Sequence, residues 1–196
     1  MRLFGITSAL LSLCAFVPYA SDTLRGRTQP QRASWLIWSV LGSIALGSQI
    51  FEGASTSLWF ATIQVGGTIL ILFLAVLHGA GPFLKRGDRY VLAAAACGLL
   101  LWMMTDTAAY ALAITITISL LGGLVTIRKA YRDPRSETMV TWFCSFVAAG
   151  FAILSVGQVD LVLMAYPMYL LVLNGAIVAA MMLGRARMAR PAYVAI

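Results

Sequence analysis

The chain has 196 residues, of which 61% are hydrophobic and 11% are charged, and its formal net charge is +7. A soluble domain carries about a quarter charged residues, so the composition excludes an ordinary soluble protein and predicts one embedded in a lipid bilayer. The basic residues lie in short segments between apolar runs, where they set membrane orientation and touch anionic headgroups. The positive charge therefore does not indicate nucleic acid as a partner.

Seven apolar runs predict an all-α integral membrane protein with seven transmembrane helices. A helix needs about 20 apolar residues to cross a bilayer, because backbone groups cannot stay unpaired in hydrocarbon. The fourth run is the shortest, and Thr105–Thr107 leaves little room for a turn before the fifth. Asp133-Pro134 with Ser136 and Glu137 predicts a capped start for the sixth. The predicted spans are residues 3–20, 33–51, 58–78, 90–105, 107–127, 138–156 and 160–183.

The distribution of basic residues predicts the orientation. Of the fourteen Lys and Arg residues, only Arg2 precedes the first span. The others lie between spans one and two, three and four, and five and six, or in the tail after Leu183, and these segments share one face of a seven-helix protein. The opposite segments carry Glu52, Asp106 and Asp160. Because basic segments stay in the cytoplasm, we predict a multi-pass protein of the cytoplasmic (inner) membrane, with the N-terminus outside and the C-terminus in the cytoplasm.

Two stretches of the chain share one pattern. Val17–Trp35 and Val125–Trp142 each leave an apolar run, cross a basic loop and enter the next run at a tryptophan. A shift of 107 positions places Trp35 on Trp142. We therefore predict two parallel three-helix repeats joined by a linker helix (3+1+3), a plan known in transporters. The predicted segments are 1–80 for the first repeat, 81–106 for the linker with the fourth helix, 107–184 for the second repeat and 185–196 for a basic cytoplasmic tail.

The first run has an alternative interpretation as a cleaved signal peptide. Arg2 precedes an apolar stretch, and Pro18-Tyr19-Ala20 stands before Ser21 in the manner of a cleavage site. We expect the run to be a membrane helix, because the repeat needs it as the partner of the fifth span.

The residues of the two basic loops resemble a known superfamily. Pro18-Tyr19 before the first loop and Ser34-Trp35 after it, with the segments TQPQRASWLIW and RKAYRDPRSETMVTW, are similar to the PQ-loop superfamily, which includes the SWEET sugar carriers, and to an uncharacterised bacterial seven-helix family of that type. The resemblance implies a hinge for alternating access at Pro18, because proline removes a backbone donor. The matching pair in the second half, Val125-Thr126, has no proline, so no second hinge is carried over.

Two amides are candidate substrate contacts. Asn174 lies in the seventh span beside Gly175, and Gln64 lies in the third span beside Gly66. The SWEET resemblance implies an asparagine facing the substrate on each of these helices, which Asn174 fits and Gln64 approximates. An amide offers donors and an acceptor to a neutral solute. The alternative is a hydrogen bond to a neighbouring helix, which polar residues in membrane bundles commonly make.

Four tryptophans stand near the starts of predicted helices. Trp35 and Trp142 are repeat partners, and we predict that they line the substrate cavity or gate it. Their alternative is the aromatic belt, in which the ring lies at headgroup level. Trp38 and Trp59 are assigned to that belt.

These features predict a small-solute transporter that works by facilitated diffusion on a neutral polar solute such as a sugar or an amino acid. No charged residue lies clearly in mid-span, as an ion-coupled pump would need. The alternative is a non-transporting receptor or accessory subunit on the same fold. The sequence holds no catalytic or metal-binding pattern, so we expect no enzyme activity, no cofactor and no metal. The expected partners are the bilayer and the solute, and a homo-oligomer is left open.

Overall fold

The computed structural model describes residues 1–30, 32–51, 53, 58–79, 108–157 and 159–189, with six single positions between 90 and 104. Within these residues every regular element is an α-helix, as the sequence predicted. The helices are α1 (Arg2–Leu24), α2 (Arg32–Phe51), α3 (Leu58–His78), α5 (Ala108–Arg132), α6 (Met139–Val156) and α7 (Leu161–Ala189).

The observed helices follow the predicted spans closely. The range 58–78 is both the predicted third span and the observed α3. The structure extends α5 to Arg132 and α7 to Ala189, each beyond its predicted end. Basic residues in these last turns interact favourably with the negative end of the helix dipole, so the helices continue past the apolar run. The predicted fourth span, residues 90–105, lies outside the described residues except at single positions.

The six helices pack in a closed ring. The order around the ring is α1, α3, α2, α5, α7 and α6, which returns to α1. Each helix of the first half has a counterpart in the second half: α1 matches α5, α2 matches α6 and α3 matches α7. If every helix is replaced by its counterpart, each helix keeps the same neighbours, so the ring has a twofold order. The sequence shift agrees, because 107 positions separate Arg32 at the start of α2 from Met139 at the start of α6.

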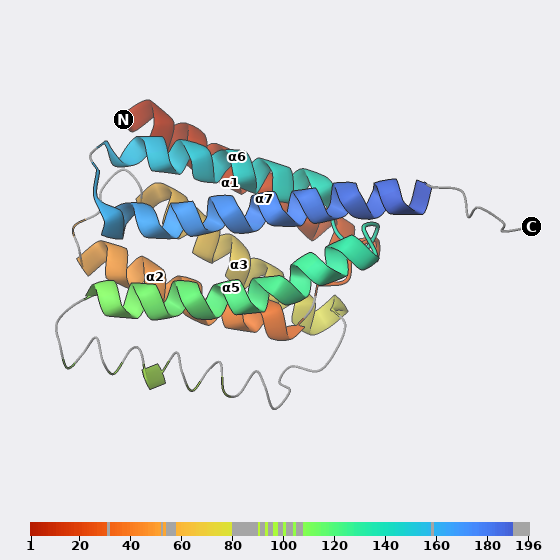
Figure 1. Ribbon diagram of the computed structural model, residues 1–196, viewed down its shortest axis with the longest axis horizontal. Helices are drawn as coiled ribbons and strands as arrows, with labels where there is room; N and C mark the ends of the chain where they lie inside the picture. The colour runs from red at the N-terminus through yellow and green to blue at the C-terminus, as the bar shows by residue number, and fades with distance from the viewer. Residues whose placement is uncertain are drawn as a thin grey trace, which may run out of the picture.

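The helix directions divide the molecule into two ends. In Figure 1, α1, α3, α5 and α7 all run from left to right, whereas α2 and α6 run from right to left. The loops at 25–30 and 133–138 therefore lie at the same end as the C-terminal end of α7. We call this the basic end, because it carries the arginines and lysine Arg25, Arg27, Arg32, Arg128, Lys129, Arg132, Arg135, Arg185 and Arg187.

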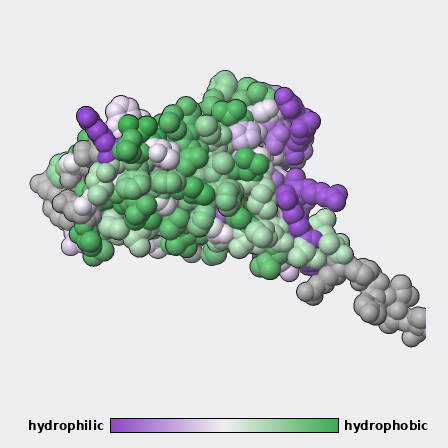
Figure 2. Space-filling model, turned by 90° about the horizontal axis from the view of Figure 1, so that it is seen from above, coloured by the Kyte–Doolittle hydropathy of each residue, from purple (hydrophilic) through white to green (hydrophobic). Residues whose placement is uncertain are grey.

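The outer surface is apolar along the helices. Figure 2 shows a mainly hydrophobic middle, with most of the strongly hydrophilic surface at one end. Five of the described helices, α1, α2, α3, α6 and α7, are long and apolar enough to cross a membrane. This indicates a membrane protein, because a soluble protein does not expose so continuous an apolar surface. Exposed side chains on this surface include Leu3, Leu10, Val17, Phe73, Val172 and Met182.

The contact between α1 and α6 includes small residues joined by hydroxyl bonds. Ser8 Oγ donates a hydrogen bond to Ala148 O, and Thr141 Oγ1 donates one to Ala15 O, both at 2.8 Å. Small residues allow close backbone approach, and hydroxyl–carbonyl bonds then join the helices in a medium without water. The matching contact, between α2 and α5, is instead a cluster of the aliphatic side chains Ile37, Leu41 and Ile118.

Candidate functional site

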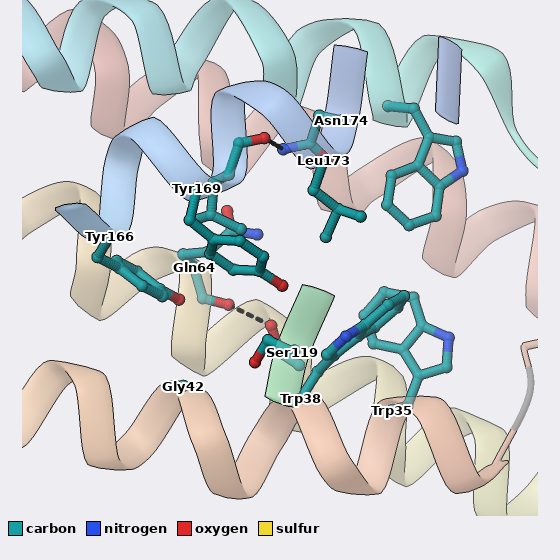
Figure 3. Close-up of a pocket in the computed structure, with 12 residues that line it drawn as sticks. Trp35, Trp38, Gly42, Gln64, Ser119, Tyr166, Tyr169, Leu173 and Asn174 are labelled. Atoms are coloured by element: carbon teal, nitrogen blue, oxygen red, sulfur yellow. Dashed lines mark hydrogen bonds between the residues drawn. The ribbon is translucent and has the colours of Figure 1, made fainter. Parts of the chain in front are cut away.

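A cavity lies inside the ring of helices, near the middle of α2 at Gly42 and of α5 at Ser119 (Figure 3). Its volume is about 40 Å³, which is room for about three water molecules. Aromatic rings, amides and hydroxyls form its walls, and none of the described residues that line it is Asp, Glu, Lys, Arg or His. The lining residues are Trp35, Trp38, Gly42, Gln64, Thr68, Ser119, Trp142, Tyr166, Tyr169, Leu170, Leu173 and Asn174.

The structure brings together all four residues that the sequence proposed as substrate contacts. Trp35 comes from α2, Gln64 from α3, Trp142 from α6 and Asn174 from α7, and all four line this one cavity. Both halves of the chain therefore contribute to its wall. Their role in binding a substrate stays a prediction.

The two amides are held in different ways. Asn174 is buried, with an exposed fraction of 2%. Its Nδ2 donates to Leu170 O on its own helix at 2.7 Å (Figure 3). Gln64 Oε1 accepts from Ser12 Oγ on α1 at 3.1 Å, so Gln64 makes the interhelical bond that was its alternative role. Asn174 thus bonds within its own helix, whereas Gln64 bonds a neighbouring helix through its oxygen.

Tryptophan rings form the wall of the cavity on the side of the basic end. The rings of Trp35 and Trp38 meet edge to face with centroids 5.4 Å apart, and those of Trp38 and Trp142 are 6.3 Å apart. The assignment of Trp38 to the aromatic belt was wrong, because its ring faces the cavity. Trp38 lies in the second turn of α2, so it is farther from the basic end than a residue in the first turn. Trp59, by contrast, is 66% exposed.

A buried acid lies just outside this wall. Glu137 Oε2 accepts hydrogen bonds from Trp142 Nε1 at 3.2 Å and from the Tyr19 hydroxyl at 3.3 Å. Its other oxygen accepts from Lys129 Nζ at 2.9 Å. The expected capping role of Glu137 was wrong: the residue before α6 is Thr138, without a side-chain cap bond. An N-cap satisfies the helix locally, whereas a buried carboxylate needs a cation, and Lys129 supplies one.

The two basic loops bind each other beyond Glu137. The hydroxyls of Thr28 and Thr138 are 2.9 Å apart, and Thr138 Oγ1 also donates to Asp22 Oδ2 at 3.0 Å. Lys129 Nζ lies 3.4 Å from Gln29 O, to which it donates. Together with the bond from Tyr19 to Glu137, these contacts join the first half of the chain to the second at the basic end.

Two prolines lie inside helices of the ring. Pro18, the predicted hinge, is half-buried in α1, and the helix continues through it. Pro167 lies inside α7 and is fully buried. It was not predicted as a hinge, because it does not flank either basic loop. Tyr166 and Tyr169 on the same helix line the cavity and were also missed, although two tyrosines around a proline inside an apolar run were a usable signal.

The described residues hold no group of three His, Cys, Asp or Glu that could bind a metal ion. No protein-family model, curated protein or solved structure matches this chain. Function is therefore inferred from the residues of the chain and their geometry.

Proposed function

We propose that this protein is a small-solute membrane transporter of PQ-loop or SWEET-like architecture, which moves a neutral solute by facilitated diffusion. The observation that carries the proposal is the cavity between the two halves of the chain. It is lined by Trp35 and Gln64 from the first half and by Trp142 and Asn174 from the second. Transporters built from repeats place the substrate at the repeat interface near the middle of the membrane.

The duplicated 3+1+3 architecture with seven spans is part of the proposal. The twofold order of the helix ring supports it, as does the parallel course of α1 and α5 in Figure 1. α3 ends at the basic end and α5 begins at the opposite end, which agrees with one further span between them, predicted at residues 90–105. The stretch Ala108–Val125 of α5 contains no charged residue, which suits a sixth described span.

The cavity wall favours an uncharged solute. Amides and hydroxyls offer donors and acceptors, and the aromatic rings offer apolar faces. The described lining residues include no ionisable Asp, Glu, Lys, Arg or His, so a charged solute would have no counter-ion at this site. The absence of ionisable side chains from the described wall also supports facilitated diffusion over ion-coupled transport.

The proposed movement is a rocking of one half against the other. In the observed form, the bonds from Tyr19 to Glu137 and between Thr28 and Thr138 hold the halves together at the basic end. Opening toward that end would break these bonds. Pro18 is the proposed hinge in the first half and Pro167 in the second, because each removes one backbone hydrogen bond from its helix.

The proposed location is the cytoplasmic membrane, with the basic end in the cytoplasm. The concentration of arginines and lysine at one end of the helix ring supports this orientation. It places the N-terminus outside and the C-terminal end of α7 inside.

Uptake by proteoliposomes would test the proposed function. We expect at least one compound from a panel of sugars, polyols, amino acids and neutral amides to enter vesicles that hold the wild-type protein. Asn174→Ala should reduce that uptake. Gln49→Ala, which removes a buried amide from α2 outside the cavity, should leave it largely intact. Entry of no panel compound would contradict transport and favour a receptor or an accessory subunit.

A further inference from the structure

The indole N–H of Trp38 is a buried donor without an acceptor. Its Nε1 has no hydrogen-bond partner, and among the described side chains only one other buried polar atom, Gln49 Nε2, shares this condition. Gln49 does not line the cavity, whereas Trp38 does. A buried polar group that lacks a partner is costly and requires an explanation, such as a bound water or ligand.

The neighbouring indole shows what such a donor requires. Trp142 Nε1 donates to the Glu137 carboxylate at 3.2 Å. Trp38 packs against the Trp142 ring but has no protein acceptor within reach. In Figure 3 its ring rises from α2 between Ser119 and Trp35, at the edge of the cavity. The protein therefore leaves this N–H unpaired, on a ring that lines the cavity.

We propose that Trp38 selects the solute, by donating its indole N–H to a carbonyl or hydroxyl oxygen of an uncharged molecule in the cavity. The inference rests on the proposed function, because it treats the cavity as a solute site, and it adds the residue that sets specificity. The absence of charged side chains from the described wall matches an uncharged molecule. Asn174 lies on α7 across the same cavity and offers a second polar contact.

The size of the cavity narrows the class of molecule. At about 40 Å³ the cavity of the observed form holds about three groups of the size of water. A short neutral amide or alcohol is much nearer to this size than a hexose, which requires a wider form of the protein. The solute class assigned is therefore a small uncharged amide or polyol, with its oxygen toward Trp38 and its carbon skeleton against the aromatic rings.

Nuclear magnetic resonance of the tryptophan indole groups would test this assignment directly. The protein in nanodiscs would be labelled with ¹⁵N at its indoles and titrated with acetamide, glycerol and D-glucose, with sodium acetate as the charged match of acetamide. Trp38→Phe would assign the Trp38 signal and would also remove the donor. We expect acetamide or glycerol to shift that signal and acetate to leave it unchanged. Trp38→Phe should weaken the binding of the shifting compound about 5- to 15-fold.

Trp59→Phe is the matched control, because Trp59 is exposed at the start of α3, away from the cavity, and its loss should leave affinity unchanged. Equal affinity in the wild type and in Trp38→Phe would overturn the inference. So would a Trp38 signal that no compound shifts, since water would then be its partner. Binding through Trp38 without uptake into proteoliposomes would leave this inference standing and contradict the proposed function alone.

Discussion

The indole Nε1 of Trp142 donates a hydrogen bond to Glu137 Oε2 at 3.2 Å, which joins the wall of the cavity to the buried acid at the basic end. The Glu137 side chain is only 4% exposed, and Lys129 Nζ is its cationic partner at 2.9 Å. Glu137→Gln removes the charge that holds Lys129 in place and weakens the bonds from Tyr19 and Trp142. We expect it to lower the free energy of unfolding in detergent by about 1–3 kcal/mol, measured by chemical unfolding.

Asp133→Asn makes the same change from carboxylate to amide at an exposed position of the same loop. It should alter the free energy of unfolding by less than about 0.5 kcal/mol. Equal effects of the two substitutions would show that the Glu137 contacts do not stabilise the basic end.

A close approach between α1 and α3 gives a second prediction. A Cβ added to Gly67 would overlap the buried ring of Phe16, whereas one added to Gly66 would meet no atom within 4 Å. Gly67→Ala should therefore destabilise the protein by about 1–3 kcal/mol. Gly66→Ala should be neutral or stabilising by up to about 1 kcal/mol, because alanine favours the helix. Unfolding of both variants in detergent measures the difference, and similar stabilities would refute this packing.

The hydroxyl of Thr141 gives a third prediction. It donates from α6 to Ala15 O on α1 at 2.8 Å, one turn before Pro18. Thr141→Val keeps the shape of the side chain and removes the bond, so it should cost about 1 kcal/mol of stability. Thr117 bonds only Ala113 O of its own helix and is exposed. Thr117→Val should therefore lower stability by less. An equal loss of stability in both variants would show that the bond from Thr141 to Ala15 does not stabilise the contact between α1 and α6.

The prolines give a fourth prediction, on rate rather than affinity. Pro18→Ala restores a backbone donor to α1 and should raise helix stability by up to about 3 kcal/mol. If Pro18 is a hinge, the rate of solute uptake should fall, while the dissociation constant for the solute should stay unchanged. Pro167→Ala in α7 should act in the same way. Uptake at the wild-type rate in both variants would remove the prolines from the mechanism.

Much of the fold was accessible from the sequence because the signals lay in length and charge. The span 58–78 is a continuous apolar run with turn residues beyond each end, and it matches α3. The 107-residue shift placed Trp35 on Trp142, and the structure puts both rings on one cavity. Asn174 and Gln64 were found because polar side chains are rare in such spans.

The missed features depended on which face of a helix turns inward. In a membrane bundle both the lipid-facing and the buried faces are apolar, so periodicity does not tell them apart. Trp38 and Trp59 therefore looked alike, although one lines the cavity and the other is exposed. Glu137 was assigned to a helix cap from its local neighbours, because its partner Tyr19 is more than a hundred residues away in the chain.

The proposed transport requires a cavity that opens to each side of the membrane in turn, and thiol labelling of Ser119→Cys tests this most directly. Ser119 is 4% exposed and lines the cavity from α5, and cysteine differs little from serine in size. Cys14, Cys97 and Cys144 would first be replaced by alanine so that only the new thiol reacts. A membrane-impermeant thiol reagent would be applied to vesicles of either orientation. Labelling from both sides is the predicted result; labelling from one side only, or from neither, would contradict the account.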